Sequence, residues 1–379
     1  MVVGLLLALN GAICASLSTS LAKTTRFGSD DLAHELYSAK IIQYPALPVL
    51  DYMQNTSAWQ FAYNPAYLPG KGVQGLFVRV QNGSTTLPGT CGRPTSPSFV
   101  AFSRLTDTGR AMPLGERKVF SPALTDFEQT AEDPRIIYDA SNQTWIMTYT
   151  ANGAVKSNST KPPMNRHQGI ATSTDPLTPG SWKRHCTAAA PCLPPGRKSG
   201  AMLQRDSPPH YMFVYDLTLN CPSNPGSVCR HTVVAESQDL LSWHLAAGNN
   251  VLLPRRPGMW DAGLIEPGPP PLRLQSGDYV FFYNGATMSN DRQYHVGFAI
   301  LSSENPTHVL QRSASPVLSW TDRPWMVGNS SAYLCYTPSV VFCNGARHVE
   351  GKVDTFELFF GGADAVVGSA TVALLPNRV

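Results

Sequence analysis

Two carboxylates, Asp133 and Glu266, are the residues of this chain best placed to do chemistry. Asp133 lies in the sequence Glu-Asp-Pro-Arg at residues 132–135, where alternation along an extended segment would project Asp133 and Arg135 together. Glu266 precedes a Pro-Gly-Pro-Pro-Pro run at residues 267–271, which fixes its backbone in a stiff segment. Cleavage of a glycosidic bond needs one carboxyl group to protonate the leaving oxygen and another to activate water or attack the sugar. In an inverting enzyme such a pair stands roughly 6.5–9.5 Å apart.

Both carboxylates also have an ordinary structural explanation. Asp133 and Arg135 could form a surface ion pair at a strand end, and Glu266 could be a solvated residue of a rigid turn. Trp260, six residues before Glu266, could supply an aromatic platform for the apolar face of a sugar ring.

Three further polar residues occur beside small residues at predicted strand ends. Lys198 precedes Ser-Gly-Ala, although a lone lysine is usually solvated. Asn284 ends an apolar strand and could face a cavity, but Asn-Gly is also a common turn dipeptide. Asp364 follows Gly-Gly-Ala, where small residues would let another backbone or a ligand approach; a hairpin turn is the alternative.

The composition predicts an all-β protein that could position these residues. Charged residues make up only 15% of the chain, and Pro (32) and Gly (30) are abundant turn formers. Residues 135–138 and 144–150 are apolar runs around a polar turn at 139–143, which predicts a β-hairpin. Further short strands are expected at residues 73–80, 98–103, 169–173, 201–203, 211–215, 232–237, 279–284, 295–301, 338–342 and 355–360. No convincing helix is predicted.

A weak internal repeat indicates how these strands are grouped. Ser173-Thr174-Asp175 precedes Trp182, and Ser237-Gln238-Asp239 precedes Trp243, about 65 residues apart; Ser103 and Asp107 form a looser copy. A turn repeated at this spacing suits the blades of a β-propeller, each a small sheet of about four strands. A two-sheet sandwich is the alternative, but it would not require the repeat.

The N-terminal residues predict export. Residues 2–12 form a short apolar run that ends in small residues, so we interpret residues 1–22 as a signal peptide, although a positive charge before the run is missing. Residues 23–59 are predicted to be an N-terminal extension with a short helical turn at 30–37, and residues 60–379 the folded domain. Asn-x-Ser/Thr sequons support a secreted glycoprotein; they lie at Asn55, Asn82, Asn142, Asn158 and Asn329.

Cysteine spacing agrees with an oxidising compartment. Cys14 would leave with the leader, and the pairs Cys186/Cys192 and Cys221/Cys229 suit small disulfide loops. Cys335 with Cys343 is a less certain third pair, which leaves Cys91 over. Zinc is the competing interpretation, but there is no Cys-x-x-Cys and no neighbouring His pair, so we expect neither a metal nor a cofactor.

The charge excludes some partners. A formal net charge of +3 is small for 379 residues and includes no basic block. We therefore expect no nucleic-acid partner and, once the leader is removed, no membrane partner. The expected partner is an oligosaccharide or glycan substrate; the oligomeric state cannot be predicted.

Six motifs together give the chain a family resemblance. They occur in the order seen in glycoside hydrolase family 130, which contains β-mannoside phosphorylases and hydrolases, and they span residues from about 61 to the C-terminus. The motifs are Asn64-Pro65 with Arg79, residues 132–135, residues 198–201, Trp260-Asp261 through residue 271, Tyr283-Asn284-Gly285, and residues 362–364. The resemblance implies a five-bladed β-propeller with its active site at the central funnel.

The resemblance also implies roles for individual residues. Asp133 would be the general acid and would deliver its proton through a hydroxyl of the bound mannose. Such a relay suits an aspartate whose pKa a neighbouring arginine depresses. The residues expected to bind sugar or phosphate are Asn64, Arg79, Arg135, Lys198, Asp216, Trp260, Asp261, Tyr283, Asn284 and Asp364.

Three departures from the family pattern favour hydrolysis. Of the cations that bind phosphate in the family's phosphorylases, Lys198 and Arg135 remain in this chain. Asn284, however, replaces the His of the family's Tyr-His-Gly motif. Tyr215-Asp216 stands where phosphorylases typically carry His-Arg, and Glu266 where they usually carry Gly. Additional carboxylates would repel a phosphate dianion and supply a base for water. We therefore predict a secreted, inverting β-mannoside hydrolase with Glu266 as base and Asp216 as the second choice. A β-mannosyl phosphorylase that releases mannose 1-phosphate is the first alternative, and a non-catalytic carbohydrate-binding propeller is the second.

Overall fold

The protein is described here by a computed structural model. It describes residues 35–377 apart from residues 71, 84–90, 107, 154–165, 222–223, 249, 288–292 and 329–331. The leader, most of the predicted helical turn at 30–37, and the sequons at Asn158 and Asn329 lie outside the described residues. Residues 36–378 form one compact unit. In the described part of the chain, no helix is long and apolar enough to cross a membrane.

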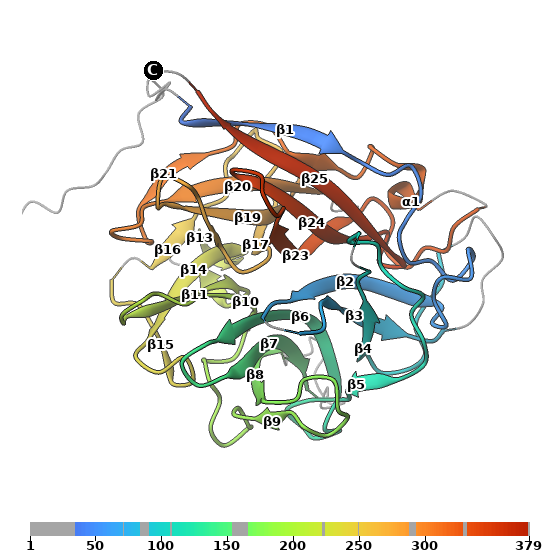
Figure 1. Cartoon of the computed structure of the whole chain (residues 1–379). Helices are drawn as coiled ribbons and strands as arrows, with labels where there is room; N and C mark the ends of the chain where they lie inside the picture. The colour runs from blue at the N-terminus through green and yellow to red at the C-terminus, as the bar shows by residue number, and fades with distance from the viewer. Residues whose placement is uncertain are drawn as a thin grey trace, which may run out of the picture. The chain divides into compact units, whose positions relative to one another are not determined.

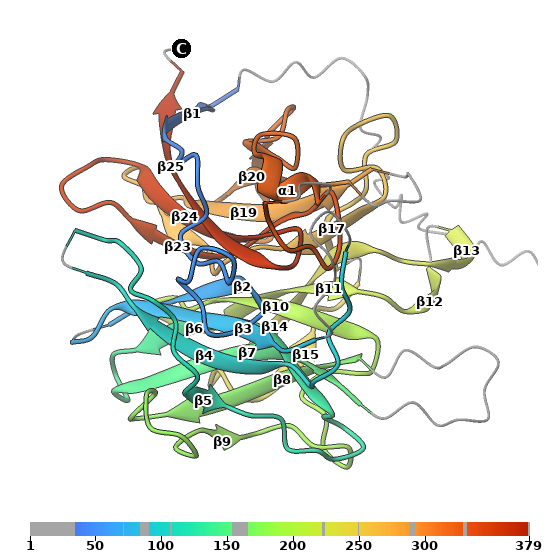
Figure 2. The same ribbon diagram turned by 90° about the vertical axis from the view of Figure 1, so that its right-hand side faces the viewer.

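Five antiparallel sheets follow one another around a ring, so the unit is a five-bladed β-propeller, as predicted (Figures 1 and 2). The first blade contains β2 (Phe61–Leu68), β3 (Gly75–Gln81), β4 (Phe99–Arg104) and β5 (Lys118–Phe120). The second contains β6 (Thr130–Asp139), β7 (Thr144–Asn152), β8 (Arg166–Ser173) and β9 (Lys183–Arg184). The third contains β10 (Arg197–Leu203), β11 (His210–Asp216), β14 (His231–Ser237), β15 (Trp243–Leu245) and β16 (Val251–Leu253).

The last two blades complete the ring. The fourth contains β17 (Leu264–Pro267), β18 (Leu272–Arg273), β19 (Tyr279–Ala286), β20 (Tyr294–Leu301), β21 (Val309–Arg312) and β22 (Leu318–Ser319). The fifth contains β23 (Val341–His348), β24 (Thr355–Gly362), β25 (Val366–Pro376) and β1 (Tyr37–Gln43). A separate hairpin, β12 (Leu219–Cys221) and β13 (Asn224–Val228), leaves the third blade, and a short helix α1 (Pro324–Val327) precedes the fifth.

Strand β1 closes the ring. It pairs antiparallel with β25 at the outer edge of the fifth blade, so that both ends of the described chain share one sheet (Figure 1). Residues 37–43 were predicted to belong to an extension before the domain, but in the structure they are part of its last blade. The pattern missed β1 because most of its residues are exposed and its partner is more than 300 residues away.

Apolar faces of neighbouring blades pack against each other and form the core. Phe77 of the first blade contacts Trp182 of the second edge-on, with ring centroids 5.9 Å apart. Phe282 of the fourth blade contacts Phe356 of the fifth in the same way, at 5.7 Å. Burial of such faces is the main favourable term for this architecture.

Two disulfides are present among the described cysteines. Cys186–Cys192 forms as predicted. Cys91, which was expected to be left over, is bonded to Cys335, so the predicted pair of Cys335 with Cys343 is wrong. Cys343 is a buried thiol on β23, and the predicted Cys221–Cys229 bond is not formed either. The Cys91–Cys335 bond joins the loop after β3 to the segment before β23, and it therefore links the first and last blades.

Local sequence signals are confirmed where they depend on neighbouring residues. The predicted hairpin corresponds to β6 and β7, whose register pairs Arg135 with Thr148. The repeated Ser-x-Asp turns end the third strands of two blades: Ser173 Oγ accepts from the amide of Asp175, and Ser237 Oγ accepts from the amide of Asp239.

Candidate active site

The first strands of the blades meet around the centre of the ring. Strand β2 contacts β6 and β23, and β10 contacts β6 and β17. A pocket of about 480 Å³ opens at this centre. Its lining is predominantly polar and consists of Asn64, Arg79, Glu132, Asp133, Asn152, Arg166, Lys198, Tyr215, Leu217, Val228, Arg230, Glu266, Tyr294, Tyr336, Thr337, Val340, Phe342 and Asp364.

A β-bulge interrupts the first strand of three successive blades. The register shifts between Tyr63 and Ala66 on β2, between Glu132 and Arg135 on β6, and between Lys198 and Ala201 on β10. Each bulge contains one residue in the left-handed region: Asn64 (φ 47°), Asp133 (φ 53°) and Ser199 (φ 59°). This conformation is costly for residues other than glycine and is concentrated at functional sites, where a bulge re-aims a side chain. The three bulges therefore turn polar side chains toward the centre.

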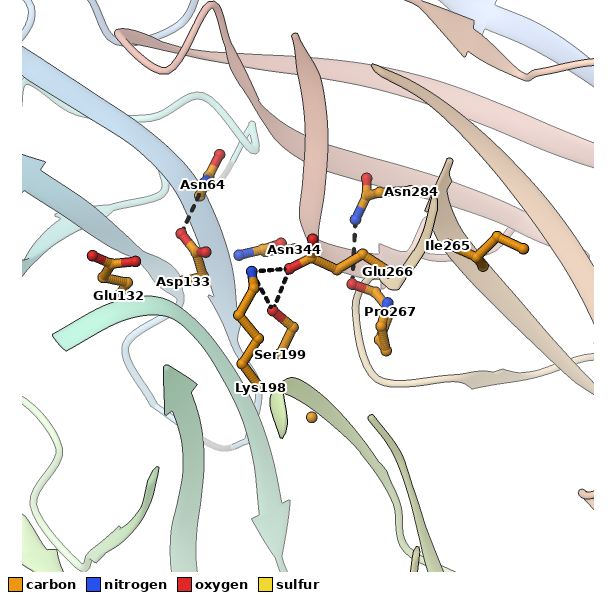
Figure 3. A network of polar contacts seen from close by, with 12 residues as sticks. Asn64, Glu132, Asp133, Lys198, Ser199, Ile265, Glu266, Pro267, Asn284 and Asn344 are labelled. Atoms are coloured by element: carbon orange, nitrogen blue, oxygen red, sulfur yellow. Dashed lines mark hydrogen bonds and ion pairs between the residues drawn. The ribbon is translucent and has the colours of Figure 1, made fainter. Parts of the chain in front are cut away.

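Asp133 is held by two donors at the pocket. Its Oδ1 accepts a hydrogen bond from Asn64 Nδ2 at 2.8 Å (Figure 3) and another from Arg79 Nη1 at 2.9 Å. Arg79 also contacts Glu132 at 3.1 Å. Burial alone would raise the pKa of Asp133, but the positive charges of Arg79, Lys198 and Arg135 and the Asn64 hydrogen bond outweigh it. They lower this pKa from 3.8 to about 2. Asp133 is therefore ionised at neutral pH.

Glu266 faces the same pocket from β17, and only 2% of it is exposed. Its Oε1 accepts from Lys198 Nζ and from Ser199 Oγ, both on the bulge of β10 (Figure 3). The acid and the base candidate thus belong to the second and fourth blades, and each is paired with a cation from another blade. A buried carboxylate needs such partners.

Arg135 lies behind the pocket, and it is not part of its lining. Its guanidinium donates to the carbonyl oxygens of Gly268 (2.6 Å), Pro267 (2.5 Å) and Asp133 (3.0 Å), and to Asn344 Oδ1 (3.2 Å). Burial lowers its pKa from 12.5 to about 10 despite the nearby carboxylates. The prediction that Arg135 projects with Asp133 fails because the bulge breaks the strict alternation of the strand. Arg135 instead ties the backbone beside Asp133 to the backbone after Glu266.

Asp364 lines the pocket in a turn with two left-handed residues, Ala363 (φ 47°) and Asp364 itself (φ 50°). Burial raises its pKa from 3.8 to about 6, although the Thr337 hydrogen bond and the charge of Arg79 act in the opposite direction. The small residues before it serve close packing, because a Cβ on Gly361 would overlap Asn64 Oδ1.

Besides Arg135, five predicted site residues lie outside the pocket lining. Asp216 accepts from the amide of Thr218 at 2.8 Å and lies 3.5 Å from Arg197. The other four support the fourth blade. Trp260 stacks on Tyr283, whose hydroxyl donates to Asp261, and the Asn284 side chain joins β19 to the backbones of Pro267 and Cys343.

Several pocket residues were not foreseen. Glu132 and Tyr215 adjoin predicted site residues, and they could have been found by extending those motifs by one position. Tyr336 and Thr337 lie before β23. Arg166 begins β8, and Arg230 directly precedes β14. No sequence signal marks these two arginines, because only the ring closure brings them to the pocket. Within the described part of the chain, neither arginine side chain forms a hydrogen bond or an ion pair.

The arrangement suits acid–base cleavage of a polar substrate. Asp133 and Glu266 face one cavity from different blades, and cations and amides fix their positions. Among the described residues, the only cluster of three potential metal ligands lies outside the pocket lining, at Cys221, Cys229 and His231.

Comparison with known proteins agrees with the motifs. No protein-family model matches the chain. A 1,2-β-oligomannan phosphorylase from Thermoanaerobacter sp. (strain X514) is 28% identical over 142 residues, which cover 37% of this chain and 42% of that protein. A β-1,2-mannobiose phosphorylase from Listeria innocua serovar 6a is 34% identical over 131 residues, which cover 35% of this chain and 32% of that protein. The chain thus aligns with less than half the length of these curated relatives.

A solved structure shares the fold over most of the chain. It is described as coming from "the GH130 family of mannoside phosphorylases", which "contains glycoside hydrolases that target beta-1,2 mannosidic linkages in Candida mannan". The TM-score is 0.65 at 23% identity, and the match covers 89% of this chain and 94% of that chain. The resemblance to glycoside hydrolase family 130 that the six motifs indicate is therefore confirmed, both by named sequence relatives and by the five-bladed fold.

Proposed function

We propose that the protein is a carbohydrate-active enzyme that cleaves β-linked mannosides at the central pocket. The observation that carries the proposal is that Asp133 and Glu266 line one pocket, each fixed by a cation from another blade. The names of the curated relatives support a β-mannoside as the substrate.

Asp133 is proposed as the general acid. Its low pKa makes direct protonation of the leaving oxygen unfavourable at neutral pH, because the carboxylate is the stable form beside Arg79. The route implied by the family resemblance also requires a protonated Asp133, in the complex with substrate. Asp133 would then give its proton to a mannose hydroxyl as that hydroxyl gives its own proton to the glycosidic oxygen. Asn64 and Arg79 would keep the carboxyl group aimed at that hydroxyl throughout.

Water is the proposed acceptor, with Glu266 as the general base. Glu266 would take one proton from the water as the water oxygen bonds to the anomeric carbon and the glycosidic bond breaks with inversion. Lys198 and Ser199 fix the carboxylate for this step. Because Glu266 binds Lys198, it also occupies a cation that could otherwise hold a phosphate.

Phosphorolysis is the second candidate, and two observations favour it. The curated relatives are named as phosphorylases. Arg166 and Arg230 line the pocket, and two guanidinium groups there could bind a phosphate dianion. In that case phosphate would replace water as the nucleophile, and mannose 1-phosphate would be released.

The shared proposal is tested by incubating the enzyme with β-1,2- and β-1,4-linked manno-oligosaccharides, with and without phosphate, and measuring any released sugar. Asp133→Asn should lower cleavage by about 10²–10⁴-fold, the usual contribution of a general acid. Asp139→Asn is the matched control, because it removes a carboxylate from the far end of the same strand. Absence of cleavage under both conditions, or an Asp133→Asn variant as active as the control, would refute the proposal.

A further inference from the structure

A cluster of two cysteines and one histidine lies beside the pocket wall. Cys221 ends β12, Cys229 follows β13, and His231 begins β14. All three side chains are buried, with 0%, 1% and 6% of their surfaces exposed. Their ligand atoms lie within 4.8 Å of one another, and Cys221 Sγ is 4.0 Å from His231 Nδ1. Neither cysteine is in a disulfide.

This geometry is close to that of a zinc site. Zn–S bonds of about 2.3 Å and Zn–N bonds of about 2.0–2.1 Å in a tetrahedron put the ligand atoms roughly 3.5–3.8 Å apart. The ligand atoms, which lie within 4.8 Å of one another, would therefore have to approach by up to about 1 Å to bind the ion. Thiolate and imidazole are also the ligand types that zinc prefers in proteins.

We propose that Cys221, Cys229 and His231 bind one Zn²⁺ ion that anchors the β12–β13 hairpin. The fourth position is left to water. The expectation of no metal rested on the absence of a Cys-x-x-Cys pair. The hairpin instead folds a Cys-x₇-Cys-x-His sequence so that its three ligands converge.

The position of the hairpin gives such an ion a structural purpose. The β12–β13 sheet has only two strands and is separate from the blades. A two-stranded hairpin is marginally stable by itself, and metal binding supplies folding free energy. Leu217 precedes β12, Val228 ends β13 and Arg230 follows it, and all three line the pocket. The ion would therefore fix one wall of the substrate pocket, whichever acceptor the enzyme uses.

A disulfide between Cys221 and Cys229 is the competing state, because the same chain contains two other disulfides. Zinc-bound thiolates and a disulfide exclude each other at this site. The two states are separated by metal content and by peptide mass mapping without reduction.

The test uses the full chain, purified without chelators, with zinc measured by mass spectrometry and Co²⁺ exchanged into the site. We expect one equivalent of zinc and, with Co²⁺, sulfur-to-cobalt charge-transfer absorption in the near ultraviolet. Cys229→Ser and His231→Gln should each lose both signals. Cys343→Ala should keep both, because it removes a buried thiol on β23 that is not part of the cluster. A chain without stoichiometric zinc, a Cys221–Cys229 cross-linked peptide, or equal zinc in all variants would overturn the proposal.

Discussion

Replacement of Arg135 by lysine tests whether one buried side chain sets the geometry of both carboxylates. The guanidinium donates four hydrogen bonds, to the carbonyl oxygens of Asp133, Pro267 and Gly268 and to Asn344 Oδ1. A lysine ammonium is a single point of contact and can replace one or two of them. Each buried acceptor left without its charged donor costs about 1.5–3 kcal/mol. With two or three bonds lost, we expect Arg135→Lys to lower the free energy of unfolding by about 3–9 kcal/mol.

The same change should impair catalysis beyond its effect on stability. Arg135 joins the backbone of the acid to the segment that follows the base, and a displacement of about 1 Å between reacting groups can cost roughly 10²-fold in rate. We therefore expect kcat to fall by about 10²-fold while the pocket residues themselves are unchanged.

Arg323→Lys is the matched control for this experiment. Arg323 also donates to three carbonyl oxygens, those of Tyr44, Pro45 and Asp322, but it is not part of the pocket lining. Urea unfolding gives the stability of each variant, and initial rates on a manno-oligosaccharide give kcat and KM. If Arg135→Lys loses no more kcat than Arg323→Lys, Arg135 does not position the site.

Three other predictions follow from the same geometry. Asp364 has a raised pKa of about 6, so folding favours its protonated form: its contribution to stability is present below pH 3.8 and is lost as the pH rises through 6. The free energy of unfolding should therefore fall by up to ~3 kcal/mol as the pH rises, and Asp364→Asn should abolish this fall, as measured by urea unfolding at pH 4 and pH 7. Glu266→Gln should lower phosphate-independent cleavage by about 10²–10⁴-fold, measured as released mannose; an unchanged rate would exclude Glu266 as the base. Serine replacement of both Cys91 and Cys335, which are 244 residues apart, should lower stability by about 2–5 kcal/mol in urea unfolding, and an unchanged midpoint would contradict this.

The sequence predicts those parts of the fold that depend on local pattern. The hairpin of β6 and β7 follows from two apolar runs around a polar turn, and the Ser-x-Asp repeat identifies equivalent turns in two blades. Pairings between distant segments leave no such signal. Strand β1 joins β25, and Cys91 bonds Cys335, only because the ring closes.

The site shows the same division. Asp133, Glu266 and Lys198 are found from residue type, unusual backbone and family motifs, and the structure brings them to one pocket. The direct contact of Lys198 with Glu266 could not be predicted, since these residues come from different blades. The sequence wrongly predicts that Arg135 projects into the pocket with Asp133. Side chains two residues apart share a face only in a regular strand, and the bulge at Asp133 interrupts that alternation.

A left-handed residue in the first strand of successive blades was available as a signal. Asn64-Pro65 and Asp133-Pro134 repeat an Asx-Pro pair, and Ser199-Gly200 occupies the equivalent bulge in the third blade. Asn and Asp tolerate positive φ better than most residues, so this repeat marks where the chain turns polar groups inward.

The most direct test of the proposed hydrolysis is to follow the first product by NMR on β-1,2-mannobiose in phosphate-free buffer and again with phosphate. With Asp133 as acid and Glu266 as base for water, α-mannose should appear first without phosphate, because inversion of a β-linkage gives the α-anomer. Release of mannose 1-phosphate only when phosphate is present, with no free sugar in its absence, would contradict hydrolysis and make phosphate the nucleophile.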